Sequence, residues 1–188
     1  MVRRFPHVTV RKISPFASSR NGAKPLLIVV HATQSHNYKG DRDLAAIGEW
    51  FQNPAAQVSS HVCTDADGHS ARYVPDAEKA WHCAGFNGVS LGVEQVGMVG
   101  DTWTRAEVRE TARWIAVWSR KHGIPIRQGQ VNQNGTVIRS GVLRHSDLGA
   151  KGGNHDDPGS SYPWRLLLGL AVFYRAAQLT AIRNKYHG

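Results

Sequence analysis

The chain has 188 residues, of which 41% are hydrophobic and 20% charged, a composition typical of a globular protein that can bury one core. Its formal net charge of +9 predicts a negatively charged partner, and nucleic acid, an anionic membrane surface and an acidic cell wall all qualify. The longest apolar stretch, residues 166–174, is far shorter than the roughly 20 residues that cross a bilayer, so no membrane insertion is expected.

The N-terminal residues and the cysteines bear on the cellular compartment. Residues 1–7 are basic, but residues 8–12 are not the apolar segment of a signal peptide. We therefore expect a protein that is made in the cytoplasm and reaches an external target only after release. Cys63 and Cys83 form no CxxC pair, which favours two buried free thiols and leaves a single disulfide open.

Hydrophobic periodicity predicts strands and helices that alternate along the chain. The expected elements are a strand at 25–30, a helix at 41–52, a hairpin with strands at 58–64 and 71–75, a strand at 90–97, a helix at 104–121, a strand at 142–144 and a helix from 163 to about 183. The continuous apolar run of the first strand is typical of a strand covered on both faces. Thr104 and Glu107 form a capping box that begins the second helix, and Gly123 ends it.

The irregular segments define the expected organisation of the chain. Residues 1–24 are interpreted as an N-terminal lead-in, and residues 25–188 as one catalytic domain. The Gly- and Asn-rich stretches at 132–135 and 149–159 predict long loops. Mixed strands and helices in this order predict an α/β fold, with a single mixed β-sheet flanked by helices.

Several histidines fall at the ends of predicted strands, where sites assemble. His31 ends the first strand, and His145 follows the strand at 142–144. Two histidines and a carboxylate with one open position form the ligand set of hydrolytic zinc, because both groups suit the ion and the open position holds the reacting water. The segment 155–159 supplies the carboxylate from Asp156 or Asp157, a choice that the residue pattern leaves open.

Glu94 is an acidic residue within the otherwise apolar strand at 90–97. An unpaired buried carboxylate is costly, so its presence favours a functional role, and a zinc hydrolase needs a general base. A structural glutamate held in a salt bridge is the alternative.

Six motifs follow one another in a fixed order: Val29-Val30-His31-Ala32-Thr33, Val58-Ser59-Ser60-His61, Ala80-Trp81-His82-Cys83-Ala84-Gly85, Ser90-Leu91-Gly92-Val93-Glu94, Arg144-His145-Ser146-Asp147-Leu148 and Asp157-Pro158-Gly159. This ordered set resembles the type-2 N-acetylmuramoyl-L-alanine amidase family, which includes phage endolysin amidases, cytosolic muropeptide-recycling amidases and peptidoglycan recognition proteins of animals. The resemblance extends from about residue 26 to 164 and implies an amidase or peptidoglycan recognition protein-like fold.

The resemblance also implies roles for individual residues. His31, His145 and Asp157 would bind Zn2+, and Glu94 would match the catalytic glutamate of the recycling-type members. Some phage members instead use a Tyr just before the hairpin histidine, where this chain has Ser60.

The resemblance leaves the surrounding residues less defined. The substrate groove would be lined by His61, His82 and Trp81. For the two histidines, the alternative is that they support the metal ligands or the fold. Many members carry a Lys two residues before the third ligand, where it stabilises an oxyanion, but this chain has His155 there. Either His155 or Lys151 would then complete the catalytic set with Glu94.

The function expected from the resemblance is zinc-dependent hydrolysis of the amide between N-acetylmuramic acid and L-alanine in peptidoglycan, by a phage or prophage lytic enzyme. The positive charge suits stem-peptide carboxylates and anionic cell-wall polymers. A non-catalytic peptidoglycan-binding module and a cytosolic muropeptide-recycling amidase are the alternatives. Nucleic acid is not an expected partner, because Trp103, Trp114 and Trp118 lie on or beside a helix with core periodicity.

Overall fold

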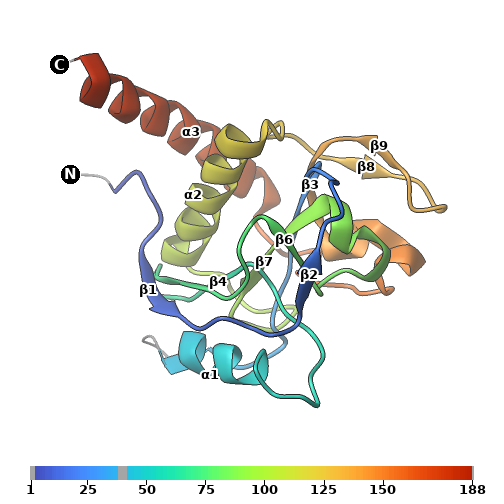
Figure 1. The fold of residues 1–188 in the computed structure, drawn as a ribbon. Coiled ribbons are helices and arrows are strands. Elements are labelled where there is room, and N and C mark those ends of the chain that lie inside the picture. Colours follow the sequence, from blue (N-terminus) through green and yellow to red (C-terminus); the bar gives the residue numbers. More distant parts are fainter. Residues whose placement is uncertain (1–2, 38–41, 188) are drawn as a thin grey trace.

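The computed structural model describes residues 3–37 and 42–187, and a six-stranded mixed sheet lies at its centre (Figure 1). In spatial order the strands are β1 (Val8–Arg11), β5 (Ser70–Arg72), β4 (Val62–Thr64), β7 (Ser90–Gln95), β3 (Leu27–Val30) and β10 (Gly141–Arg144). Neighbouring strands are parallel except for the hairpin of β4 and β5. Two antiparallel ribbons lie outside this sheet: β2 (Ala17–Ser19) with β6 (Glu78–Ala80), and β8 (Gln130–Val131) with β9 (Val137–Arg139).

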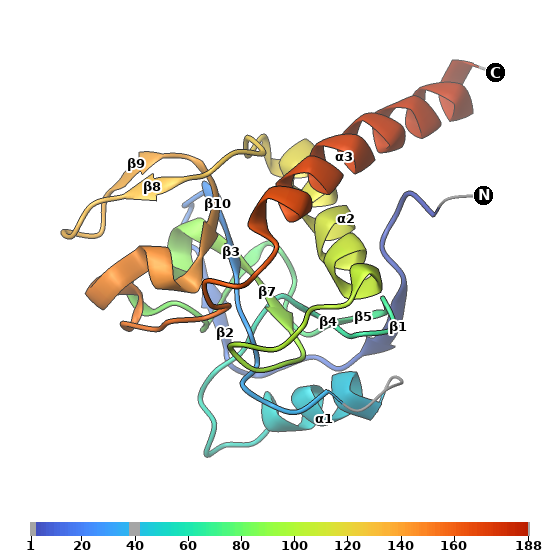
Figure 2. The same ribbon diagram turned by 180° about the vertical axis from the view of Figure 1, so that it is seen from behind.

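Helices cover both faces of the sheet, which confirms the predicted α/β class (Figure 2). They are α1 (Arg42–Trp50), α2 (Arg105–His122) and α3 (Trp164–His187), with two short 3-10 segments, η1 (Ala84–Val89) and η2 (His145–Gly152). Helices α2 and α3 pack on one face, whereas α1, η1 and η2 pack on the other.

The alternation of side chains along β3 decides which residues can form a site. Ile28 and Val30 pack against α2 and α3, so the next residue, His31, belongs to the opposite face. Glu94 and His145 stand one position beyond the residues of β7 and β10 that pair with Val30. The three side chains therefore leave the sheet on the same face, at the carboxyl ends of adjacent parallel strands.

Helix α2 begins and ends where the sequence predicts. The Thr104 side chain accepts a hydrogen bond from the Glu107 amide at 3.1 Å, and Gly123 ends the helix in a left-handed conformation with φ of 72°. Trp114 and Trp118 are buried against the sheet, which confirms that their spacing reflects the core.

Other predicted elements occur with different bounds. The hairpin strands are shorter than expected, and the stretch 132–135 forms the turn between β8 and β9 rather than a long loop. The stretch 149–159 begins inside η2 and continues as a loop. The expected first residue of the first helix, Asp41, lies outside the described residues.

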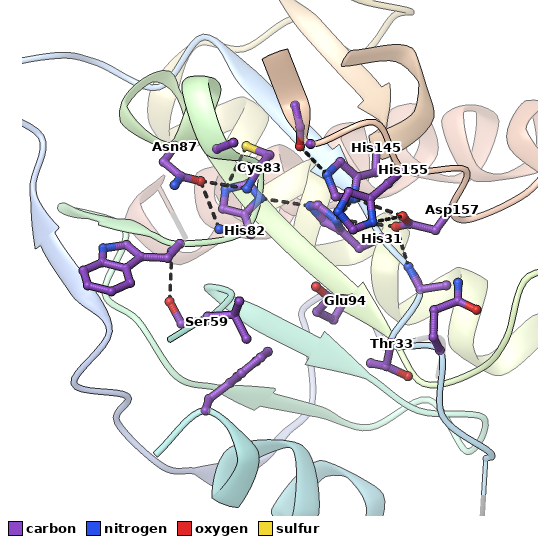
Figure 3. A pocket seen from close by; sticks show the side chains of 18 of the residues that line it. His31, Thr33, Ser59, His82, Cys83, Asn87, Glu94, His145, His155 and Asp157 are labelled. Atoms are coloured by element: carbon purple, nitrogen blue, oxygen red, sulfur yellow. Dashed lines mark hydrogen bonds and ion pairs between the residues drawn. The ribbon is translucent and has the colours of Figure 1, made fainter. Parts of the chain in front are cut away.

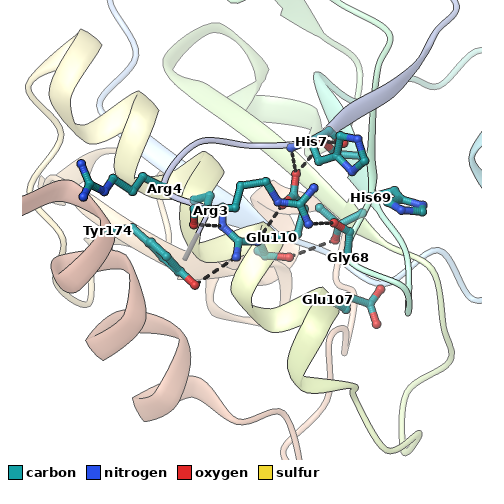
Figure 4. Close-up of polar contacts among 12 residues, drawn as sticks. Arg3, Arg4, His7, Gly68, His69, Glu107, Glu110 and Tyr174 are labelled. Carbon is teal, nitrogen blue, oxygen red and sulfur yellow. Dashed lines mark hydrogen bonds and ion pairs between the residues drawn. The ribbon is translucent and has the colours of Figure 1, made fainter. Parts of the chain in front are cut away.

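The segment expected to be a lead-in is part of the fold over its described residues. Strand β1 forms the edge of the central sheet beside β5, and β2 pairs with β6. The Glu110 carboxylate of α2 accepts hydrogen bonds from the backbone amide of His7, from Ser70 and from Arg113 (Figure 4). Arg113 in turn donates to the Arg3 carbonyl at 3.0 Å. No pattern in the sequence indicated this anchor, because β1 has only four residues and is half-exposed.

Helix α3 has two dissimilar sides. Trp164, Leu167, Ala171 and Tyr174 form a buried stripe that packs on α2 and the sheet, as the core periodicity predicts. The opposite side stays open to solvent. Among the described residues, α3 alone has the length and apolar composition to cross a membrane. Only 22% of its most apolar 18-residue segment is buried within the structure.

We predict that Glu110→Ala lowers the free energy of unfolding by about 3–5 kcal/mol, because the substitution leaves the buried Arg113 guanidinium without its carboxylate. The matched control is Glu49→Ala, which removes an exposed ion pair with Lys12 and should cost less than about 1 kcal/mol. Urea unfolding of the two variants measures the difference. Equal effects would mean that the Glu110 anchor does not stabilise the fold.

Candidate metal centre and groove

Three buried side chains converge at the carboxyl ends of β3 and β10. The Nδ1 atoms of His31 and His145 lie 3.0 Å apart, and the Asp157 carboxylate lies 3.0 Å from His145 Nδ1 and 3.5 Å from His31 Nδ1 (Figure 3). One ligand atom from each residue falls within 4.8 Å of the others. The Ala32 amide donates to Asp157 at 3.1 Å and fixes the carboxylate, whereas Asp156 is exposed, so the structure selects Asp157.

The outer nitrogen of His145 determines where its proton lies. His145 Nε2 is 2.9 Å from the Gly152 carbonyl oxygen, which can only accept a hydrogen bond. A neutral His145 ring would therefore carry its proton on Nε2 and direct an Nδ1 lone pair into the cluster. A backbone carbonyl in this position is the usual way in which a metal-binding histidine is oriented.

A chain of hydrogen bonds determines the tautomer of His31 in the same way. Ser90 Oγ donates to the Phe86 carbonyl at 2.8 Å, so it accepts from His82 Nε2 at 3.0 Å. His82 Nδ1 is then the acceptor for His31 Nε2, which lies 2.9 Å away. With its proton on Nε2, His31 also directs an Nδ1 lone pair into the cluster. Gly92 leaves room for this chain, because a Cβ atom there would lie 2.6 Å from His82 Nδ1.

This arrangement fits a bound cation. Burial lowers the pKa of His31 to about 4, so its ring is neutral at neutral pH. Two imidazole nitrogens and one buried carboxylate thus face one another at the centre of the cluster. Two nitrogens and one oxygen are a donor set that zinc accepts.

Glu94 lies on the floor of the same groove, below His31 in Figure 3. Among the residues that the structure describes, none forms a hydrogen bond or ion pair with its carboxylate, which removes the alternative of a salt-bridged structural glutamate. Burial and the charge of Asp157 raise the pKa of Glu94 well above its usual value. An unpaired carboxylate with a raised pKa is suited to exchange protons at neutral pH.

The two candidates for an oxyanion donor occupy different places. His155 lines the groove, where its ring stacks on His145 with centroids 4.1 Å apart, and 56% of its side chain is exposed. Lys151 does not line the groove, and its side chain runs beside Gly135 in the turn between β8 and β9. The structure therefore places His155, and not Lys151, next to the cluster.

Two of the three predicted substrate-binding residues line the groove. Trp81 and His82 do so, but His61 is fully buried and does not. His61 Nδ1 accepts from the Gly92 amide at 3.0 Å, and its ring packs edge-on against His82. The prediction that His61 contacts substrate is wrong, because the side chain points into the sheet. The supporting role, kept as its alternative, fits this position.

Two exposed apolar side chains form the far wall of the groove, and only the second of them, Val58, lies within a motif. Trp50 at the end of α1 and Val58 after it line the groove and are 49% and 40% exposed. The groove has a volume of about 550 Å³, within the usual range of ligand sites. For Trp50, its position as a large apolar residue at the end of a helix was the signal in the sequence. Cys63 and Cys83 are free and buried, as expected.

Comparison with known proteins agrees with this geometry. The sequence model of the family described as N-acetylmuramoyl-L-alanine amidase matches residues 21–160. N-acetylmuramoyl-L-alanine amidase A of Achromobacter lyticus is 31% identical over 123 residues, which cover 61% of this chain and 69% of that protein.

Solved structures share the fold. The Staphylococcus aureus hydrolase AmiA, in complex with its ligand, has a TM-score of 0.69 at 19% identity and covers 94% of this chain and 86% of its own. An AmpD derivative has a TM-score of 0.66 at 22% identity, with coverage of 86% and 93%. The amidase LysC from Clostridium intestinale has a TM-score of 0.62 at 18% identity, with coverage of 87% and 96%.

We predict that His82→Ala weakens zinc binding by about 10–100-fold, because His31 loses the acceptor that fixes its tautomer. His82→Gln should recover part of the affinity, since its amide oxygen can accept the same hydrogen bond. Competition with a chromophoric chelator measures the dissociation constant, and circular dichroism checks that each variant is folded. Unchanged affinity in a folded His82→Ala protein would exclude this positioning role.

Proposed function

The chain belongs to the N-acetylmuramoyl-L-alanine amidase family, and we propose that it cleaves the amide between the lactyl carbonyl of N-acetylmuramic acid and L-alanine with zinc held by His31, His145 and Asp157. The observation that carries this proposal is the convergence of two histidine lone pairs and a carboxylate beside an unpaired glutamate in an open groove. When bound, zinc would polarise the scissile carbonyl and lower the pKa of water.

Glu94 would move the proton during the reaction. Its carboxylate faces the groove without a competing partner among the described residues, so it can accept a proton from the attacking water. The environment that raises its pKa then favours holding that proton until the alanine amine departs. Glu94 thus serves first as the general base and then as the general acid.

His155 would stabilise the negative charge that develops on the carbonyl oxygen. Its ring is stacked on His145 at the edge of the groove, which limits its movement, and more than half of its side chain is exposed although Nδ1 lies 3.7 Å from Asp157 Oδ1. A hydrogen bond donated by His155 to the carbonyl oxygen would stabilise the transition state most, because the donor is already oriented when the negative charge forms.

The charge of the chain supports a lytic role on the cell wall. A net charge of +9 suits a polymer that carries stem-peptide carboxylates and wall anions, whereas a small soluble muropeptide has less need of it. We therefore favour a phage or prophage enzyme that acts on the wall after release over a cytosolic recycling enzyme. The complete ligand set supports catalysis over binding alone.

We predict that the purified protein binds one zinc ion per chain and releases L-alanine amino groups from purified peptidoglycan, and that a chelator abolishes release. Glu94→Gln should retain zinc and lose about 10²–10⁴-fold in rate, since it keeps the shape of the side chain without its basicity. Metal analysis and amine labelling provide the two measurements.

Three outcomes separate the parts of the proposal. Zinc without release in the wild-type protein would favour a binding module, and release that survives the chelator would exclude the metal mechanism. Full turnover in Glu94→Gln would remove Glu94 from the reaction.

We predict that His155→Ala lowers kcat by about 10²–10³-fold, the usual effect of losing one oxyanion donor. Lys151→Ala is the matched control and should stay within about twofold, because its side chain lies beside the β8–β9 turn. Steady-state kinetics on a soluble muropeptide compares them. The reverse result would mean that the loop rearranges and brings Lys151 to the substrate.

A further inference from the structure

The outer face of α3 is apolar and open to solvent. Its large side chains are Leu166, Val172, Phe173 and Leu179, which are 45%, 54%, 55% and 39% exposed. Leu166 and Phe173 are seven residues apart, as are Val172 and Leu179, so each pair forms a stripe along the outer part of the helix. The small residues Gly169 and Ala176 lie between them and are also exposed. This surface runs along the helix rather than forming an isolated patch.

The inner face of α3 is fully engaged within the chain. Gln178 donates to the Arg4 carbonyl at 2.9 Å, and Tyr174 accepts from Arg113 at 3.1 Å. A helix with large apolar residues on both its inner and its outer side is usually covered on both, but α2 and the sheet cover only the inner side of α3. The outer face of α3 therefore has no packing partner among the described residues, although its apolar side chains favour burial.

Positive charge surrounds this face. Helix α3 contains Arg165, Arg175, Arg183 and Lys185, all exposed, and has no acidic residue. Arg4 adds another cation from the N-terminal segment, where it borders Phe173. Figures 1 and 2 show that the C-terminal half of α3, which contains Arg183 and Lys185, extends beyond the rest of the molecule.

We propose that the outer face of α3 binds the surface of an anionic phospholipid bilayer, with the helix in the plane of the membrane. Its apolar side chains would enter the boundary between headgroups and acyl chains, and its cations would contact lipid phosphates. The helix does not span the bilayer, since spanning would break the contacts of Tyr174 and Gln178 with the body of the protein. This site is separate from the groove and from the proposed reaction.

Charge argues against a second copy of the chain as the occupant. Packing two α3 helices face to face would bring eight cations together without a single acidic residue on either helix. An anionic bilayer supplies the opposite charge, and each basic residue near such a surface strengthens binding.

The experiment measures sedimentation of the full chain with vesicles of phosphatidylcholine alone or mixed equally with phosphatidylglycerol. We expect binding to the anionic vesicles at least about tenfold tighter than to the neutral ones. Phe173→Ser/Leu179→Ser should weaken it about tenfold by removing apolar contact, and Arg175→Gln and Arg183→Gln about fivefold each. Ile138→Ser is the matched control, because Ile138 is 56% exposed on β9, away from α3, and should leave binding unchanged.

Three results would overturn the proposal. They are no binding to anionic vesicles, equal binding by Phe173→Ser/Leu179→Ser and wild type, and a dimer in the analytical ultracentrifuge that this double variant abolishes. Muropeptide hydrolysis by the double variant should equal that of wild type, so loss of membrane binding and loss of amidase activity remain separate outcomes.

Discussion

Two imidazole nitrogens that face each other at 3.0 Å beside a buried carboxylate are held together best when a cation joins them. The surroundings keep the three groups in place. The Gly152 carbonyl and the His82–Ser90 chain hold the protons on the outer nitrogens, and the Ala32 amide holds Asp157. The same burial that lowers the pKa of His31 raises that of Glu94. One desolvated groove therefore keeps the His31 ring neutral and makes Glu94 able to hold a proton.

The parallel sheet is what brings these groups together. Adjacent parallel strands end at the same edge, and the register of β3, β7 and β10 places His31, Glu94 and His145 on one face. Helix α1 and the 3-10 segments cover the rest of that face and leave the groove between them. A shift of one residue in any of these strands would turn its functional side chain into the α2 core.

Local patterns in the sequence predicted much of this. The apolar run of β3, the cap of α2 and the ordered motifs indicated the sheet, the helix and the three residues of the candidate metal centre. What failed depends on contacts between distant segments. No local pattern shows that His61 points into the sheet, that Lys151 lies beside Gly135, or that β1 completes the sheet through Glu110. The periodicity of α3 revealed its buried stripe, but an apolar residue on the outer side looks the same in sequence as one in the core.

The sheet also separates the two surfaces of the molecule. Helices α2 and α3 cover one face, and the groove opens on the other, between α1 and the 3-10 segments. A chain resting on a bilayer through α3 would therefore hold its groove outward, a full domain thickness above the lipid. Membrane binding would thus orient the enzyme before it meets its substrate. The polymer layer closest to the membrane would lie within reach of the bound enzyme.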